Sequence, residues 1–281
     1  MEVSNRGKLT MPKTIGVALS GGSALGIAHI GVLKALEENG IKIDCVAGTS
    51  AGAIIAACYA FGVPLEKVAE KARGLSWYTL SKFSFSTLGF ISHAALGKLI
   101  HEFIGNVNIE DAEIPLAVIA TDLATGERMA FKKGPLADAL MASTCIPGVF
   151  IPIEIGGRLF VDGGLVDHLP LSALREMGAT VKIGANVSRW ISRQRPKNIL
   201  DVLGRSLAIA TDYRYAPEKD EIFIEPHLEA FTPSDFRKAD DLVDEGYRAA
   251  ELKIKEIRRL AGRKTPVAGF WTKAKSWLRT Y

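Results

Sequence analysis

Residues 48–52 read Gly-Thr-Ser-Ala-Gly and place Ser50 where a serine could act as a nucleophile. The apolar run 43–47 precedes this pentapeptide, and an apolar, helix-like stretch at 51–61 follows it. A serine in a tight turn between a strand and a helix stands exposed at the carboxyl edge of a sheet, and small flanking residues permit such a turn. The pattern predicts a nucleophile elbow at Ser50. A small-residue turn with a buried capping serine is the alternative that the pentapeptide leaves open.

A nucleophilic serine needs a base, and the chain offers two kinds. Among its five histidines, only His168 and His227 come late enough for the order of an α/β-hydrolase triad, and His227 suits a catalytic role as well as a surface one. The stronger candidate is Asp162, which ends an apolar run in Phe-Val-Asp-Gly-Gly. A carboxylate serves as a general base if its surroundings raise its proton affinity. The same letters also fit an Asp-Gly hairpin turn.

Five blocks of the sequence resemble the successive motifs of the patatin-like phospholipase family, and of its bacterial acyl hydrolases in particular. The blocks are 18–31 (ALSGGSALGIAHIG), 48–52, 120–127 (ATDLATGE), 142–150 (ASTCIPGVF) and 161–170 (VDGGLVDHLP). The resemblance implies a three-layer α/β/α fold with a mainly parallel central sheet. It also implies a Ser-Asp dyad without histidine, in which Ser50 attacks a lipid ester and Asp162 activates first the serine and then water.

The glycine-rich segment 21–26 departs from the family pattern Gly-Gly-Gly-x-Arg/Lys-Gly at two places. The resemblance implies an oxyanion hole made by the backbone amides of Gly21, Gly22 and Ser23. Ser23 replaces a glycine, and its side chain disfavours a positive φ and would crowd the substrate. Leu25 replaces a cation. Because losing one oxyanion donor costs about 2.7 to 4 kcal/mol, a weakly active or inactive protein with a regulatory or lipid-binding role is the alternative function.

The elements that must position these residues are expected to alternate between strands and helices. Residues 14–20, the glycine segment and 27–39 predict one strand–loop–helix unit, and 41–47, the Ser50 elbow and 51–61 predict a second. Such units build a parallel sheet with crossover helices. Further strands are expected at 115–121, 149–155, 158–161, 181–186 and 221–224. Further helices are expected at 64–73, 94–104, 136–142, 171–177, 199–213 and 236–260.

The composition favours one large domain. The chain has 281 residues, of which 48% are hydrophobic, and we expect a single acyl hydrolase domain at 14–261 between an extension at 1–13 and a tail at 262–281. Its three cysteines lie in apolar segments without C-x-x-C spacing, so we expect no disulfide, no metal and no cofactor. Residues 1–10 lack the apolar stretch of a signal peptide, which predicts a cytoplasmic location.

Two segments depart from this alternation. Residues 74–92 hold five aromatic residues among serines and glycines, which predicts a lid or an acyl-binding wall, with ordinary core packing as the alternative. The last 29 residues carry nine lysines and arginines and one acid, although the whole chain has a net charge of only +4.

In the tail, 262–281, aromatic residues at helical spacing alternate with basic ones. This pattern is typical of a helix that lies in a membrane interface. We therefore expect a lipid or acyl-ester substrate and peripheral membrane contact through the tail, with docking of the tail on its own domain as the alternative. A nucleic-acid partner is not expected, because the aromatic residues gather on one face of the helix.

Overall fold

The computed structural model describes residues 13–75, 82–83, 88–89, 91–188 and 218–262, together with the single residues 195, 202, 206 and 209. The extension at 1–12, nearly all of the expected helix at 199–213, most of the aromatic segment 74–92 and the tail from 263 onward lie outside these residues. The division into 1–13, 14–261 and 262–281 therefore stays a prediction.

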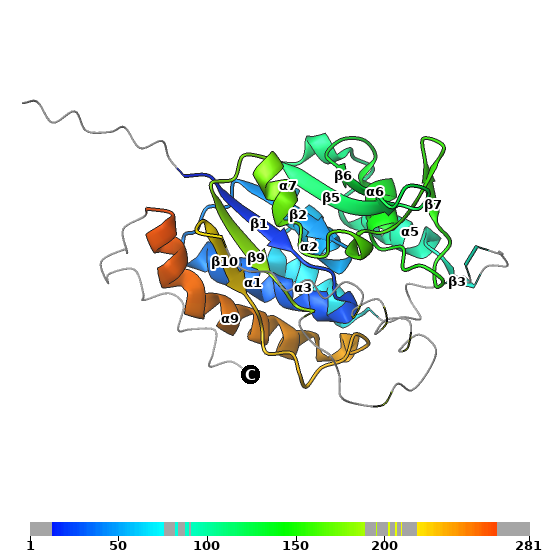
Figure 1. The fold of residues 1–281 in the computed structure, drawn as a ribbon. Coiled ribbons are helices and arrows are strands. Elements are labelled where there is room, and N and C mark those ends of the chain that lie inside the picture. The colour runs from blue at the N-terminus through cyan, green and yellow to red at the C-terminus, as the bar shows by residue number, and fades with distance from the viewer. Residues whose placement is uncertain are drawn as a thin grey trace, which may run out of the picture.

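A sheet of eight strands forms the centre of the described fold (Figure 1). The strands are β1 (Ile15–Leu19), β2 (Cys45–Thr49), β5 (Leu116–Asp122), β6 (Arg128–Phe131), β7 (Ile153–Ile155), β8 (Arg158–Asp162), β9 (Val181–Ala185) and β10 (Glu221–Ile224). Five of them run parallel in the order β10-β9-β1-β2-β5. Strands β6 and β8 both pair antiparallel with β5, and β7 pairs antiparallel with β8. The sheet is mainly parallel, as predicted.

Helices follow most of these strands. They are α1 (Ala28–Glu38), α2 (Ala51–Ala60), α3 (Leu65–Arg73), α5 (Ala94–Phe103), α6 (Leu136–Ser143), α7 (Leu171–Glu176) and α9 (Ala239–Leu260). Short 3₁₀ turns are η1 (Ser23–Ile27), η2 (Ile109–Asp111), η3 (Gly163–Leu165) and η4 (Phe236–Lys238). A separate two-stranded sheet pairs β3 (Lys82–Phe83) with β4 (Ile91–Ser92).

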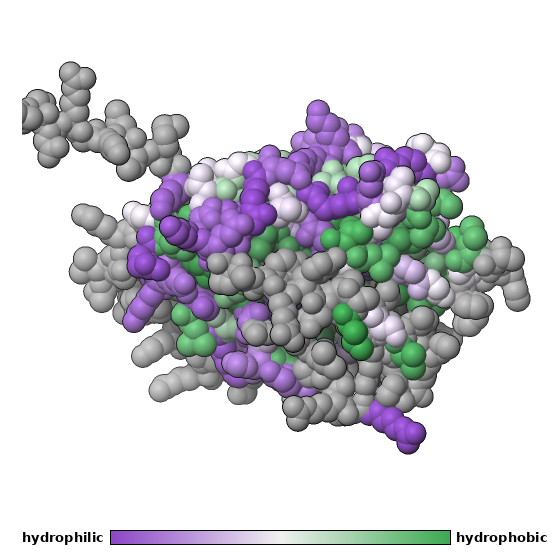
Figure 2. All heavy atoms as spheres, viewed as in Figure 1, coloured by the Kyte–Doolittle hydropathy of each residue, from purple (hydrophilic) through white to green (hydrophobic). Residues whose placement is uncertain are grey.

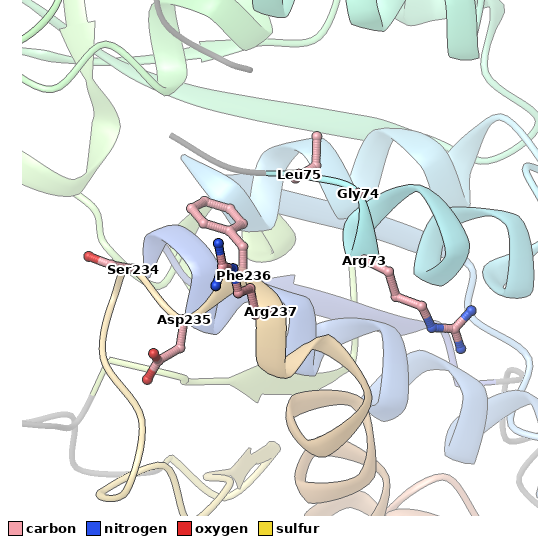
Figure 3. Close-up of a pocket in the computed structure, with 7 residues that line it drawn as sticks. All are labelled: Arg73, Gly74, Leu75, Ser234, Asp235, Phe236 and Arg237. Atoms are coloured by element: carbon pink, nitrogen blue, oxygen red, sulfur yellow. The ribbon is translucent and has the colours of Figure 1, made fainter. Parts of the chain in front are cut away.

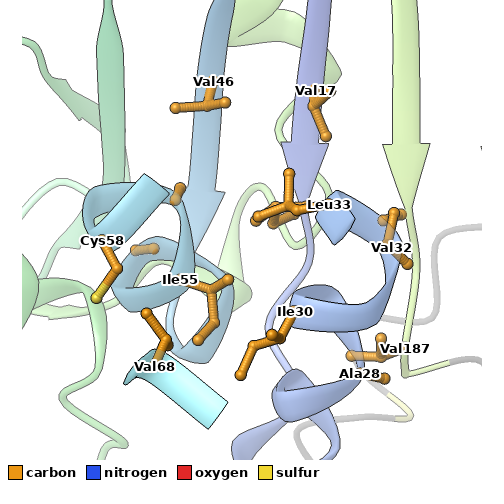
Figure 4. Close-up of a cluster of buried hydrophobic side chains, with 14 of the residues drawn as sticks. Val17, Ala28, Ile30, Val32, Leu33, Val46, Ile55, Cys58, Val68 and Val187 are labelled. Atoms are coloured by element: carbon orange, nitrogen blue, oxygen red, sulfur yellow. The ribbon is translucent and has the colours of Figure 1, made fainter. Parts of the chain in front are cut away.

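The central sheet is covered on both faces. Val17 and Leu19 of β1 belong to the large core between the sheet and helices α1, α2 and α3 (Figure 4), whereas Ala18 belongs to the smaller core under α7. This alternation follows from the two-residue period of a strand, and burial on both faces explains why the parallel strands are almost wholly apolar. The three-layer α/β/α fold is confirmed.

Helix α9 lies directly on α1, and the two backbones touch (Figure 1). A Cβ added to Gly31 of α1 would lie 1.9 Å from the Val243 carbonyl oxygen, and one added to Gly246 of α9 would lie 1.9 Å from the Ala28 carbonyl oxygen. Only glycine permits so close an approach. The contact fixes the helix that follows the glycine-rich segment.

The structure corrects two expectations about strands and adds a strand that was not predicted. The strand expected at 41–47 covers Cys45–Thr49, because residues 41–44 precede the first pairing with β1. The strand expected at 149–155 covers only Ile153–Ile155. Pro152 lacks the N–H that a strand needs, and Val149 and Phe150 instead donate to the Ile146 carbonyl in a turn. The sequence also gave no sign of β6, a short and half-buried strand with an irregular apolar pattern.

Candidate active site

Ser50 lies at the turn between β2 and α2, where it caps the helix. Its backbone is at φ 54° and ψ −125°, and Ser50 and Ser23 are the non-glycine residues with positive φ in the described part of the chain. The flanking glycines are required: a Cβ on Gly48 would lie 2.5 Å from the Ala53 Cα, and one on Gly52 would lie 2.3 Å from the Leu19 carbonyl oxygen. The strand–turn–helix context of an elbow is therefore present, and it holds the serine in a strained conformation.

Asp162 ends β8 and faces the serine directly. The Ser50 Oγ donates to Asp162 Oδ2 at 2.7 Å, and the Gly164 N–H donates to Oδ1 at 2.8 Å. The backbone of Asp162 is held on both sides, because its N–H donates to the Cys145 carbonyl at 2.8 Å and its carbonyl accepts the Thr121 hydroxyl at 2.8 Å. The chain passes from β8 into η3, so the hairpin interpretation of this turn is wrong.

The strand register explains how residues 112 positions apart meet. Thr49 of β2 is level with Ile119 of β5, and Ala120 of β5 is level with Asp162. Strand β8 runs antiparallel to β5, so it begins beyond the carboxyl edge of the parallel strands and its last residue lies closer to the middle of the sheet. Its last residue therefore reaches the level at which the chain leaves β2 for Ser50.

Burial changes the acidity of Asp162, which is only 9% exposed. Loss of hydration raises the pKa of this carboxyl to about 6, and the hydrogen bonds from the Gly164 N–H and the Ser50 hydroxyl oppose the rise without cancelling it. A carboxylate with this pKa is ionised at neutral pH and is a better proton acceptor than an exposed aspartate.

The glycine-rich segment is anchored at its first residue, Gly21, and at the preceding residue, Ser20. The buried His29 donates from Nε2 to the Ser20 carbonyl at 2.9 Å, and burial lowers the pKa of this imidazole to about 4, so it is neutral. The Ser188 hydroxyl donates to the Gly21 carbonyl at 2.6 Å, and the Gly21 N–H donates to the His168 carbonyl at 3.2 Å. The Gly21 amide is thus engaged within the protein.

The backbone N–H groups of Gly22 and Ser23 differ from that of Gly21 in their hydrogen bonding. Neither the Gly22 N–H nor the Ser23 N–H has a hydrogen bond to any other residue that the structure describes. Ser23 adopts φ 54°, and its Oγ donates at 2.9 Å to the Pro233 carbonyl, which also accepts the Ala24 N–H at 3.2 Å. The serine thus takes the positive φ that a third glycine would take, with its side chain bonded to Pro233. Leu25 is buried in the main core.

The two late histidines lie in different surroundings. His227 is exposed on the segment after β10, and no hydrogen bond joins it to Ser50 or Asp162. The His168 ring lies beside the serine: a Cβ on Gly21 would be 3.1 Å from His168 Cε1 and 3.4 Å from the Ser50 Cβ. Because Ser50 reaches Asp162 directly, this arrangement needs no intervening imidazole.

Ser143, at the end of α6, is a contact of the elbow that sequence reasoning did not single out. Its buried hydroxyl accepts the Ser50 N–H at 2.9 Å. The available signal was its position in the block 142–150, which resembles a family motif but contains no residue with an expected role.

A buried apolar cluster lies next to Asp162, because it includes the preceding residue Val161 and Cys145, whose carbonyl accepts the Asp162 N–H. Cys145, Val149, Phe150 and Val161 form a buried cluster against which the partly buried Ile146 and Leu165 pack, among others. In the surface view, apolar residues gather near α6 and β7 (Figure 2). Within the described part of the chain, no group of three or more His, Cys, Asp or Glu residues could hold a metal ion. None of the described helices has the length and apolar character needed to cross a bilayer.

A separate cavity of about 340 Å³ lies between the end of α3 and the segment that leads into α9 (Figure 3). Leu75 and Phe236 contribute apolar walls, and Ser234 follows the proline that Ser23 contacts. Neither Ser50 nor Asp162 lines this cavity.

The family model for patatin-like phospholipases matches residues 17–175, a segment that includes both Ser50 and Asp162. The chain belongs to the patatin-like phospholipase family. This patatin-like chain is 37% identical over 177 residues to an uncharacterised NTE family protein of Mycobacterium tuberculosis, with 62% of this chain and 49% of that protein covered. It is 26% identical over 284 residues to a lysophospholipase of Coccidioides immitis, with 89% of this chain and 18% of that protein covered.

These relatives are longer than the patatin-like chain, which spans about half of the mycobacterial protein and less than a fifth of the fungal one. Among solved structures, VipD from Legionella pneumophila aligns with a TM-score of 0.49 at 15% identity, covering 88% of this chain and 67% of that one.

Proposed function

We propose that this protein is a serine acyl hydrolase that cleaves carboxylic esters of lipids through an acyl-enzyme. The observation that carries the proposal is the 2.7 Å hydrogen bond from Ser50 Oγ to Asp162 Oδ2 in a member of the patatin-like phospholipase family. Three further observations support it: the strained turn, the raised pKa of Asp162, and the Gly22 and Ser23 amides, which have no acceptor among the residues that the structure describes.

In the first half-reaction, Ser50 Oγ attacks the ester carbonyl carbon while Asp162 takes the hydroxyl proton. The carbonyl oxygen becomes an oxyanion that accepts hydrogen bonds from the Gly22 and Ser23 N–H groups and lies near the positive end of α2. The intermediate collapses as the carbon–oxygen bond to the alcohol breaks. Asp162 returns its proton to the departing alkoxide, and the acyl group stays on Ser50.

In the second half-reaction, Asp162 removes a proton from water, and the resulting hydroxide attacks the acyl-enzyme carbonyl. The same amides hold the second oxyanion, which collapses to the free fatty acid and restores the Ser50 hydroxyl with the proton from Asp162. The Gly21 amide could join the other two donors only by giving up its bond to the His168 carbonyl.

Membership of the patatin-like phospholipase family favours substrates that carry an acyl chain. Phospholipase A, lysophospholipase and simple esterase activities all fit this chemistry, and the similarity to a fungal lysophospholipase makes a lysophospholipid the first substrate to try. A cytoplasmic location and membrane contact through the tail remain predictions from the sequence alone.

The decisive experiment is stoichiometric labelling with a fluorophosphonate probe, read by intact mass. We expect one label on the wild type, none on Ser50→Ala and a steep loss of rate in Asp162→Asn. Ser206→Ala and Asp241→Asn, which alter an exposed serine and an exposed aspartate, should label like the wild type. Hydrolysis of lysophosphatidylcholine, phosphatidylcholine and a short p-nitrophenyl ester by the same proteins would then rank the substrates.

Absence of labelling in a well-folded wild type would overturn the proposal and favour the weakly active, regulatory alternative. A gain of labelling in Ser23→Gly would then identify the glycine-rich segment as the cause, because this variant restores the third glycine of the family pattern; Leu25 is left unchanged because it is buried in the main core.

A further inference from the structure

The backbone of Ser50 needs an external partner. A helix-capping residue does not use its N–H in the helix, and a buried N–H without an acceptor costs free energy comparable to a lost hydrogen bond. The positive φ of Ser50 adds strain that persists only where the surroundings hold the residue. In the described structure, the Ser143 Oγ meets this need by accepting the Ser50 N–H at 2.9 Å.

Ser143 is well placed to hold that amide still. It is fully buried and is the last residue of α6, a helix packed against β5, β8 and α2. A short serine side chain on a buried helix end has few alternative positions, so its oxygen defines a fixed point for the Ser50 backbone.

The turn that follows Ser143 holds the backbone of Asp162. The carbonyl of Cys145, two residues further on, accepts the Asp162 N–H at 2.8 Å. Thr144, between them, donates its hydroxyl to the Leu140 carbonyl at 2.8 Å, and its oxygen contacts His93 Nε2 at 3.1 Å. Residues 143–145 thus touch the backbones of both Ser50 and Asp162, which lie far apart in the sequence.

We propose that Ser143 is a positioning residue for the hydrolytic reaction: its hydroxyl fixes the Ser50 backbone so that Oγ stays within hydrogen-bonding distance of Asp162 Oδ2. The inference rests on the proposed function and assigns a role to the family-like block 142–150. Ser143 does not touch the reacting atoms through its side chain, and it acts through the Ser50 amide. Because catalytic groups must be held within a fraction of an ångström, loss of this fixed point should lower turnover rather than substrate binding.

The test compares Ser143→Ala with Thr180→Val. Thr180 is a matched control, because its hydroxyl also accepts a backbone N–H, that of Thr14, at 2.9 Å, but at the opposite edge of the sheet. We expect kcat for a soluble ester and the fluorophosphonate rate constant of Ser143→Ala to fall about 10- to 100-fold. KM should stay within about twofold. The pH midpoint of activity should move upward, because Asp162 loses the Ser50 hydroxyl that opposes the rise of its pKa. The control should keep wild-type kinetics.

A kcat of Ser143→Ala that equals the wild-type value would overturn the inference, as would an equal loss in Thr180→Val. The crystal structure of Ser143→Ala supplies a readout that does not need activity. We expect a changed Ser50 backbone and a broken Ser50–Asp162 hydrogen bond, and an unchanged 2.7 Å separation would also overturn the inference. An inactive wild type would overturn the proposed function, and the crystal structure would still decide the role of Ser143.

Discussion

Two serines at positive φ define the candidate site at the scale of single residues. Ser50 is held by Ser143 and Asp162, and Ser23 is held by the Pro233 carbonyl. In both cases a hydrogen bond compensates for a backbone conformation that a side chain disfavours. Ser23, which departs from the family pattern of the glycine-rich segment, is thus held by Pro233, which lies 210 residues away in the sequence.

The first prediction concerns this accommodation. Ser23→Gly should keep near wild-type activity, because glycine adopts φ 54° without strain. Ser23→Ala has neither the freedom of glycine nor the bond to Pro233, and it should lower kcat/KM about 10-fold, since a non-glycine residue in this region costs about 1 to 2 kcal/mol. Steady-state kinetics on a soluble ester checks the pair. Equal activity of the two variants would show that the bond to Pro233 has no role.

The second prediction concerns the pH dependence of activity. The raised pKa of Asp162, about 6, means that the proton-accepting form appears as the pH rises through this value. We expect kcat/KM to increase from pH 5 to 7 with a midpoint near 6 and then to level off, provided that chemistry limits the rate. Asp162→Asn should lose most of the activity and the pH transition with it. A midpoint near 4 would contradict the effect of burial.

The third prediction concerns the loss of folding stability that ionisation of Asp162 causes. Its carboxyl binds a proton more tightly in the folded protein, so its ionisation destabilises the fold as the pH rises from about 4 through about 6. Asp162→Asn should therefore exceed the wild type in free energy of unfolding by about 2 to 3 kcal/mol at pH 7.5, with little difference at pH 3.5. Urea denaturation at both pH values measures this. A constant difference would point to a cause other than ionisation.

At the scale of elements, the contact between α1 and α9 leaves no space for side chains at two glycines. The two helices meet through Gly31 and Gly246, whose added Cβ atoms would each lie 1.9 Å from a backbone oxygen. Backbone atoms cannot move aside as a flexible side chain can, so any larger residue must separate the helices. The helix that carries His29, and with it the anchor of the glycine-rich segment, depends on this contact.

The fourth prediction follows from that geometry. Gly246→Ala should lower the free energy of unfolding by more than about 3 kcal/mol, despite the gain of about 1 kcal/mol in helix propensity. Gly97→Ala in α5 is the matched control, because its Cβ would meet the flexible Met141 side chain at 2.9 Å. We expect that variant to stay within about 1 kcal/mol of the wild type. Similar losses in both variants, measured by denaturant unfolding, would contradict the backbone contact.

Element prediction from the sequence succeeded where an apolar run was bounded by turn residues. Strands β1, β9 and β10 and helices α1, α2 and α3 lie within one or two residues of their predicted ranges. The exceptions have physical causes: Pro152 shortens β7, and β6 lacks a regular apolar pattern. The direction of β8 could not be foreseen either, because an isolated apolar run is the same for parallel and antiparallel pairing.

The candidate site was predictable only where a motif carried it. Ser50 and Asp162 were found through the resemblance and through their positions after apolar runs. Ser143 and Pro233 were not, because one side-chain oxygen and one carbonyl give no pattern in the sequence, and their roles arise from tertiary contacts alone.

At the scale of the whole molecule, the described fold is one three-layer unit (Figure 1). Ser50 and Asp162 lie at the carboxyl edge of its parallel strands. Open α/β sheets bind their ligands at this edge. The apolar surface near α6 and β7 (Figure 2) and the basic C-terminal tail predicted from the sequence both suit a substrate that resides in a lipid surface.

The fifth prediction concerns the tail. Changing Lys273, Lys275 and Arg279 to glutamate should weaken binding to vesicles that contain 30% anionic lipid about 10-fold or more, because each basic residue near such a surface contributes about 1 kcal/mol. Hydrolysis of a soluble ester should not change. Vesicle co-sedimentation and the ester assay measure the two effects. Unchanged sedimentation would favour the alternative in which the tail docks on its own domain.

The distance in sequence between Ser50, Asp162 and Pro233 also has a consequence for biosynthesis. A chain that has left the ribosome only as far as α6 carries Ser50, the proposed nucleophile, without Asp162, the proposed base. A chain that ends before residue 233 lacks the carbonyl that holds Ser23. In the proposed reaction, hydrolysis therefore requires a chain that has been made and folded beyond Asp162. Under the same proposal, chains that end before Asp162 would leave the lipids of the producing cell intact.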